Sequence, residues 1–130
     1  MGQTFSLLGI PASGMRTYRT WIDAISDNVA NINTVRPTDQ AAYQERFVVA
    51  RAAQDGGVVV EGVQFGDPQG RLLYDPNSPI ADANGFVRAP DMDLTDQMTS
   101  LVIAQRAYQA NVTVFERARD AYLRALEIGS

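Results

Sequence analysis

Residues 94–128 read LTDQMTSLVIAQRAYQANVTVFERARDAYLRALEI, and this stretch decides the fold. Its larger apolar side chains recur every seven residues with further apolar positions between them, the spacing that buries one face of an α-helix against another helix. Asp93 directly before the stretch is a favourable N-cap, and Gly129 directly after it ends the pattern. The sequence therefore predicts a helix over 94–128, roughly 50 Å long at about 1.5 Å per residue.

A second stretch with the same period lies near the N-terminus. It predicts a helix over about residues 12–33, because Pro11 suits a helix start and Pro37 forbids continuation. Two such helices can pair with each other or with copies of themselves, and that choice decides the function. For pairing within the chain, the predicted helix seam consists of Leu8, Met15, Tyr18, Ile22, Ile25, Val29, Ile32, Leu94, Met98, Leu101, Tyr108, Val112, Phe115, Tyr122 and Leu126.

The C-terminal stretch carries a second apolar stripe beside this seam. A two-helix hairpin covers one stripe on each helix, and leaving about seven small apolar groups in water forgoes on the order of 5 kcal/mol, at about 0.8 kcal/mol each. Alanine favours helices in any context, but a whole stripe of this kind favours packing between subunits. The predicted intersubunit residues are Ile103, Ala107, Ala110, Val114, Ala118, Ala121 and Ala125.

The middle of the chain has a different pattern. β-Prone runs at 47–50 and 58–60 flank Gln54-Asp55-Gly56-Gly57, which is typical of a hairpin turn, and residues 72–74 are a candidate third strand. Turn residues dominate the following stretch up to Pro90. A hairpin on its own is marginally stable, so we expect it to pack on a helix.

These patterns together predict a mainly α fold with a small β insert. Long N- and C-terminal helices pair as an antiparallel coiled coil, and the middle segment contains a β-hairpin. The expected division is an N-terminal helix within 1–34, a β-rich and turn-rich insert over 35–92, and a C-terminal helix within 93–130.

The composition narrows the function. The 130 residues suffice for one domain, 45% of them are hydrophobic, and the net charge is −4. Every basic residue is Arg, and the absence of a basic face argues against binding to nucleic acid or to an anionic membrane surface. No apolar run is long enough for insertion into a bilayer. The chain has neither Cys nor His, which excludes thiolate nucleophiles and imidazole acid–base chemistry.

An acidic cluster is the best remaining candidate for chemistry. Asp91, Asp93 and Asp96, with Asp82 upstream, could hold a hard cation, but the run lacks the glycine and distal Glu of a calcium loop. Helix capping already explains two of the three. We therefore expect no catalytic site, metal or cofactor. Asn31 and Asn111, beside the apolar seams, are candidates for buried amides that set the register between helices.

Three segments resemble a known family. The run from Ala12-Ser13-Gly14-Met15 to Asn28-Val29-Ala30-Asn31-Ile32-Asn33-Thr34 resembles the start of bacterial flagellar axial proteins, which include rod, hook and hook-associated proteins. The run from Tyr74-Asp75-Pro76 to Pro90-Asp91-Met92-Asp93 is similar to the proximal-rod family of the flagellar basal body, and residues 106–129 resemble that family's closing helix. Residues 35–46 and 54–57 follow no family pattern.

The resemblance implies a structural subunit of the flagellar basal body. Such proteins pass unfolded through the flagellar type III export apparatus and assemble in the periplasm into a shaft that transmits torque from motor to hook. Implied partners are copies of the chain, other rod proteins, the hook–basal-body junction protein and the membrane ring. An alternative from the residues is a self-contained helical adaptor or export chaperone that holds a partner helix in a groove. The β insert and the Asn-rich helix end favour the rod subunit.

Overall fold

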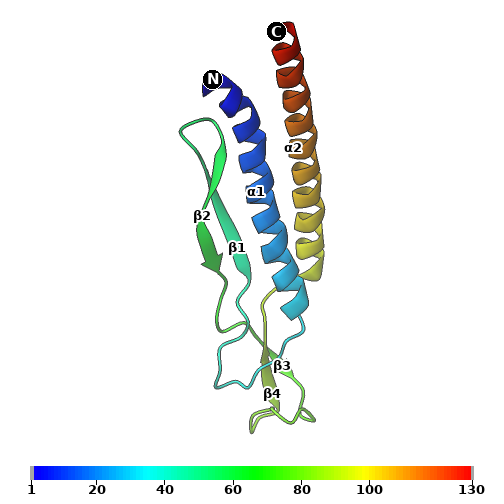
Figure 1. Cartoon of the computed structure of the whole chain (residues 1–130). Helices are drawn as coiled ribbons and strands as arrows, with labels where there is room; N and C mark the ends of the chain where they lie inside the picture. The colour runs from blue at the N-terminus through cyan, green and yellow to red at the C-terminus, as the bar shows by residue number, and fades with distance from the viewer. Residues whose placement is uncertain (1, 130) are drawn as a thin grey trace. The chain divides into compact units, whose positions relative to one another are not determined.

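In chain order, two long helices flank a β-rich middle in the computed structural model, which describes residues 2–129, with side chains from Leu7 onward (Figure 1). This order confirms the mainly α class with a small β insert. The elements are α1 (Gly2–Asn31), β1 (Arg46–Ala52), β2 (Val58–Phe65), β3 (Arg71–Tyr74), β4 (Phe86–Ala89) and α2 (Leu94–Gly129).

Helix α1 begins ten residues before the expected start and ends two residues before the expected end. Pro11 lies inside it rather than in its first turn. Because proline has no N–H, the carbonyl of Leu7 lacks its usual hydrogen-bond donor there. The helix nevertheless continues past this position. At the other end, Thr34 N–H donates to the carbonyl of Asn31 at 3.0 Å, which turns the chain out of the helix.

Helix α2 begins at the predicted residue, and its last residue is Gly129. The Oδ1 atom of Asp93 accepts a hydrogen bond from the N–H of Thr95 at 2.8 Å. This bond satisfies one of the N–H groups that the first turn of a helix leaves without a partner. The predicted N-cap is confirmed.

The β segments form two separate two-stranded sheets, β1–β2 and β3–β4. The predicted hairpin turn lies between β1 and β2, where the N–H of Ala53 donates to the carbonyl of Gly57 at 2.7 Å. Gly56 has a φ of 92°, a conformation that side chains with a Cβ rarely adopt. The predicted third strand, β3, pairs with β4, which the sequence reading did not anticipate. Their antiparallel register places Arg71 opposite Ala89 and Tyr74 opposite Phe86.

The chain divides into two compact units. Unit 1 comprises Met1–Ile22, Val48–Gly62 and Val102–Ser130, and unit 2 comprises Asp23–Phe47 and Val63–Leu101. In the described part of unit 1, Pro11, Ser13, Gly14, Thr17 and Ala104 are buried. The buried set of unit 2 is larger and includes two amide side chains. Its members are Ala24, Ile25, Asn28, Ala42, Gly85, Val87, Ala89, Pro90 and Gln97.

Candidate assembly surfaces

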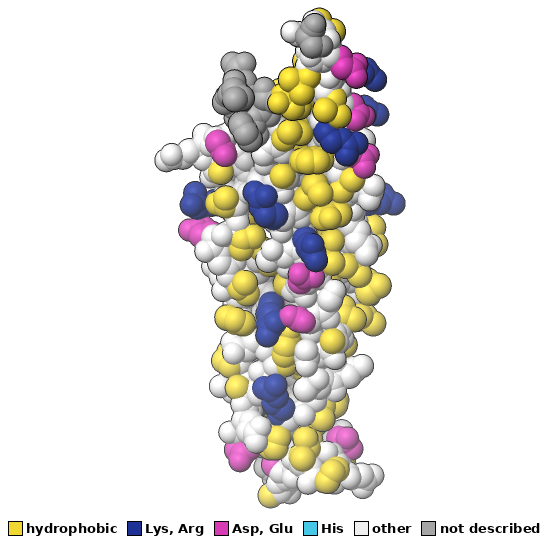
Figure 2. Space-filling view, viewed as in Figure 1, with side chains coloured by type: hydrophobic (Ala, Val, Ile, Leu, Met, Phe, Trp, Pro, Cys, Tyr) yellow, Lys and Arg dark blue, Asp and Glu magenta, His cyan; other side chains and the backbone are white. Residues whose placement is uncertain are grey.

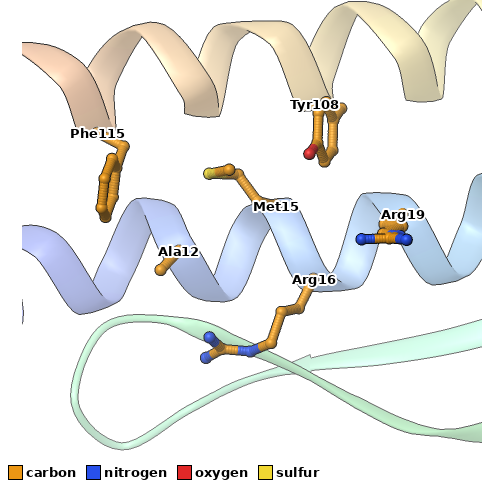
Figure 3. A pocket seen from close by; sticks show the side chains of 6 residues that line it. All are labelled: Ala12, Met15, Arg16, Arg19, Tyr108 and Phe115. Atoms are coloured by element: carbon orange, nitrogen blue, oxygen red, sulfur yellow. The ribbon is translucent and has the colours of Figure 1, made fainter.

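In unit 1, α1 and α2 lie side by side and run in opposite directions (Figures 1 and 3). Met15 of α1 lies between Tyr108 and Phe115 of α2 (Figure 3). These three predicted seam residues line one groove of about 260 Å³, together with Ala12, Arg16 and Arg19. The fold therefore brings these seam residues from opposite ends of the chain together in this unit.

The two helices approach closely at Gly14. A Cβ atom at this position would lie 2.7 Å from Cγ of Asn111, and closer still to its Oδ1. The Asn111 amide lies over the glycine, and its Nδ2 donates to the carbonyl of Ala107 at 2.8 Å. Only a residue without a side chain leaves room for the amide in this position.

The hairpin of unit 1 is tied to α1. The hydroxyl of Ser13 donates to the carbonyl of Ile10 at 2.7 Å and accepts the N–H of Val58 at 3.0 Å. A second groove is formed by one face of α1 and the strands. Tyr18, a predicted seam residue, therefore lies against the hairpin here. The residues that line this groove are Thr17, Tyr18, Trp21, Val48, Ala50 and Val58.

The remaining seam residues differ in burial. Leu94, Met98, Tyr122 and Leu126 of α2 are exposed in the single chain. Ile25 is buried. The half-buried members are Leu8, Ile22, Val29, Ile32, Leu101 and Val112.

The second stripe of α2 is largely open to solvent. Ile103 and Val114 are 52% and 53% exposed. Ala110, Ala121 and Ala125 are also exposed, while Ala107 and Ala118 are half-buried. Figure 2 shows hydrophobic side chains gathered along α2 toward its C-terminal end. From Ala121 to Gly129 every residue is exposed, so this part of the helix has little packing within the chain.

A buried amide organises unit 2. Asn28 is 1% exposed, and its Nδ2 donates to the carbonyl of Arg46 and to Oε1 of Gln97, both at 3.1 Å. Its Oδ1 accepts the N–H of Arg46 at 2.9 Å and the hydroxyl of Tyr43 at 3.0 Å. Gln97 in turn donates to the carboxyl group of Glu45. All four hydrogen-bonding positions of the Asn28 amide are therefore used.

The sequence predicted that other amides, those of Asn31 and Asn111, set the register between the helices. Asn31 donates to the carbonyl of Asp27 at 2.9 Å and accepts from the hydroxyl of Thr34 at 3.2 Å, so its bonds are local. The sequence contains one clue to Asn28: it lies three residues after the buried Ile25, on the same face of the helix. Its partners, however, lie outside the helix, in residues 43–46 and at Gln97 of α2.

Two carboxyl groups of unit 2 have shifted pKa values in opposite directions. Burial raises the pKa of Glu45, against the hydrogen bond from Gln97, which lowers it, and the nearby charges of Asp96 and Asp91 raise it further. Hydrogen bonding from the N–H of Phe86 lowers the pKa of Asp82. The hydroxyl of Thr38 and further backbone N–H groups add to this lowering.

The acidic residues that were considered for cation binding have structural roles where the structure describes their contacts. Asp93 caps α2. Asp82 closes its own loop by accepting the N–H groups of Asn84 and Phe86, each at 2.9 Å. Among residues 2–129, no group of three or more acidic side chains is arranged to hold a metal ion.

Two family models match the helical ends of the chain. "Flagella basal body rod protein" matches residues 10–38, and "Flagellar basal body rod FlgEFG protein C-terminal" matches residues 83–128. The helix pair described above falls largely within these two regions. The fold and the matches together define the class: flagellar basal-body rod proteins.

Relatives cover nearly the whole chain. The "Flagellar basal-body rod protein FlgC" of Yersinia enterocolitica is 32% identical over 129 residues, covering 95% of this chain and 96% of the relative. The protein of the same name from Bacillus subtilis strain 168 is 30% identical over 146 residues, covering 96% and 97%. The chain belongs to the FlgC family of flagellar basal-body rod proteins.

Membership of this family confirms the predicted resemblance and the location in the flagellar basal body. The protein is a structural component and not an enzyme. Over the described residues, neither helix has an apolar stretch that would suffice to cross a membrane.

Proposed function

We propose that the chain is a subunit of the proximal rod and polymerises through its terminal helices into the shaft that transmits torque from motor to hook. In this proposal α1 and α2 pair as an antiparallel coiled coil within the subunit. The second stripe of α2 packs against neighbouring subunits, and Asn111, which lies over Gly14 of α1, helps to set the register between the two helices. The helical ends of the chain form the axial core, and the segment between them braces adjacent subunits.

The observation that carries this proposal is the open apolar face of α2. Contiguous apolar surface on a protein marks a site of interaction. Here such a surface extends along α2, in a region of the chain that matches a family of rod proteins. Small side chains at Ala110, Ala121 and Ala125 allow a neighbouring helix to approach closely. Partners of this face are copies of the chain and other rod proteins.

The other contacts in the proposal follow from the position of a proximal rod. The subunit passes through the flagellar type III export apparatus and assembles in the periplasm. It adjoins the membrane ring on one side and other axial proteins, including the hook–basal-body junction protein, on the other.

A charge on the stripe tests the proposal. Val114→Glu places a carboxylate on an exposed position, so the free chain should keep its fold, whereas packing against a neighbour would bury the charge without a partner. We expect cells with this variant to export the protein but to lack complete basal bodies and motility.

Gln109→Glu is the matched control, because Gln109 is also exposed on α2 but lies outside the stripe. It should leave basal bodies and swimming intact. Normal motility with Val114→Glu would contradict packing through this face.

A further inference from the structure

Strand β3 of unit 2 has one open edge. It pairs with β4 on one side only, and all four of its residues are exposed. The far side of β4 is occupied, because Arg36 and Arg88 exchange backbone hydrogen bonds at 2.9 and 2.8 Å. An open edge exposes backbone groups that can pair with another strand.

The hydrogen-bond pattern identifies which groups point outward from β3. Arg88 directs its N–H and C=O toward Arg36, away from β3, so Leu72 opposite Arg88 is in a non-hydrogen-bonded pair. The same alternation applies to Tyr74 opposite Phe86, whose outward groups pair with Asp82. The N–H and C=O groups of Leu72 and Tyr74 therefore point to the open edge, and within the described chain they have no partner.

The sequence of this edge is complementary to itself. Arg71-Leu72-Leu73-Tyr74-Asp75 laid antiparallel on a second copy, with Leu73 opposite Leu73, brings Arg71 opposite Asp75 twice. Leu72 then lies opposite Tyr74, and these are the residues whose backbone groups point outward. One register thus satisfies the four open backbone groups of each chain and pairs both charges.

We propose that two copies of this chain associate through their β3 edges in this register and form a continuous four-stranded antiparallel sheet. Leu72 of one copy contacts Tyr74 of the other on one face, an aliphatic–aromatic cross-strand pair. Arg71 remains able to bind Asp75, because its Nε donates to the carbonyl of Pro90 and its other four N–H groups are left.

This contact is distinct from the helix packing that builds a rod. A two-fold contact closes on itself and joins two chains, whereas a polymer needs contacts between different surfaces. Two four-residue strands bury far less than the roughly 1,600 Å² of a standard interface. The pair is therefore weak, and it forms between free chains at high protein concentration.

Single cysteines in the full-length chain test the register, because the natural sequence has none. At the two-fold axis the Cα atoms of residue 73 lie about 4.5 Å apart, within disulfide range, so Leu73→Cys should give a disulfide-linked dimer on mild oxidation. Leu72→Cys alone or Tyr74→Cys alone should give none, since like positions then lie about 7–8 Å apart. An equimolar mixture of these two variants should restore the dimer.

Equal dimer from all three single variants would mean random collision and would overturn the proposal. No dimer from Leu73→Cys in concentrated, folded protein would overturn it as well, with circular dichroism as the measure of folding. Dimer from the mixture without dimer from Leu73→Cys would indicate another register and would also contradict the two-fold pairing.

Charge reversal tests the same contact independently. In the Leu73→Cys background, Asp75→Arg places arginine opposite arginine and should abolish the disulfide dimer. Adding Arg71→Asp restores both pairs with opposite sign and should restore the dimer. An unchanged dimer yield in the first variant would exclude the proposed contribution of these charges.

Discussion

At the residue scale, Asn28 connects parts of unit 2 that the sequence keeps apart. Its amide nitrogen donates to the carbonyl of Arg46 and to the side chain of Gln97. Its amide oxygen accepts from the N–H of Arg46 and from the hydroxyl of Tyr43. A buried amide with every position satisfied orders its surroundings, whereas one that loses a partner leaves a costly unpaired group. The network therefore determines how the start of α2 and the segment before β1 pack on the end of α1.

Replacing this amide should destabilise the chain. Asn28→Ala leaves the N–H of Arg46, the hydroxyl of Tyr43 and the amide of Gln97 without their partner, and we expect a loss of about 2–4 kcal/mol in the free energy of unfolding. Urea denaturation of the purified variant measures this. Asn31→Ala is the control and should change stability by about 0.5 kcal/mol or less, because its bonds are local. Equal losses would refute the role of Asn28.

The pKa of Glu45 leads to a pH dependence of stability. Its folded pKa is raised, so the folded chain binds the proton more tightly than the unfolded chain, and stability from this group increases as pH falls through the folded pKa. Glu45→Gln keeps an acceptor for Gln97 and should be more stable than the natural chain at neutral pH. The difference should shrink as pH falls to about 3, below the ordinary Glu pKa.

Asp82→Asn should change stability with pH in the opposite sense to Glu45→Gln. The folded pKa of Asp82 is lowered, so its stabilisation is present above the ordinary Asp pKa and is lost as pH falls through the folded value. This variant should therefore be less stable than the natural chain at neutral pH, with the difference vanishing in acid. Parallel stability curves for either variant would contradict the assigned causes.

At the element scale, the approach of α1 to α2 depends on Gly14. Glycine normally weakens a helix interior, and α1 contains Gly9 and Gly14 within two turns. The two positions differ in surroundings. A Cβ at Gly9 would meet nothing within 4 Å, while one at Gly14 would collide with the Asn111 amide. Helix contact, rather than local conformation, therefore requires glycine at position 14.

Alanine at the two glycines should separate these effects. Gly9→Ala should stabilise the chain by about 1 kcal/mol through helix propensity. Gly14→Ala should show little net gain, because the amide of Asn111 must leave the carbonyl of Ala107, at a cost of about 1 kcal/mol. Asn111→Ala in combination with Gly14→Ala should recover the gain in a double-mutant cycle followed by thermal unfolding. Identical gains at both glycines would rule out the close contact.

At the scale of the whole molecule, α2 continues beyond the packing that the chain itself supplies. Ala104 is fully buried in unit 1, and Gln97 is buried in unit 2. Every residue from Ala121 to Gly129 is exposed. A helix derives most of its stability from a packed apolar face, so this end has little to stabilise it in the single chain, and in the proposed rod it depends on neighbouring subunits.

Hydrogen exchange should reveal that dependence. In dilute monomer, amides of Tyr122–Gly129 should exchange fast and those of Gln97–Ala104 slowly, because exchange protection follows packing. In assembled basal bodies, the first segment should become protected. Slow exchange of both segments in the free monomer would contradict the proposed dependence of this helix end on neighbouring subunits.

Several features were predictable from the sequence because their causes are local. The N-cap at Asp93 and the start of α2 depend on neighbours within one turn, and the hairpin turn depends on Gly56. The bounds of α1 were harder to predict, because a proline in a helix usually lies in the first turn but is tolerated inside this helix. The family could be predicted from short sequence segments in their order along the chain, and this comparison does not require a structure.

The tertiary structure alone decided the features that join distant residues. Strand β4 is four residues long and includes Arg88, so its identity depends on pairing with β3 and on the bridge to Arg36. The Asn28 network needs partners from residues 43–46 and from the start of α2. The open edge of β3 exists only because no further strand pairs with it within the described chain. The amino-acid sequence by itself determined that both ends of the chain are helical, the N-cap of α2, the hairpin turn and the family, since these follow from residues near one another. Which amide is buried, which glycine lies at a helix contact and which edge stays open depend on the free energy of contacts between remote segments, and only folding brings those segments together.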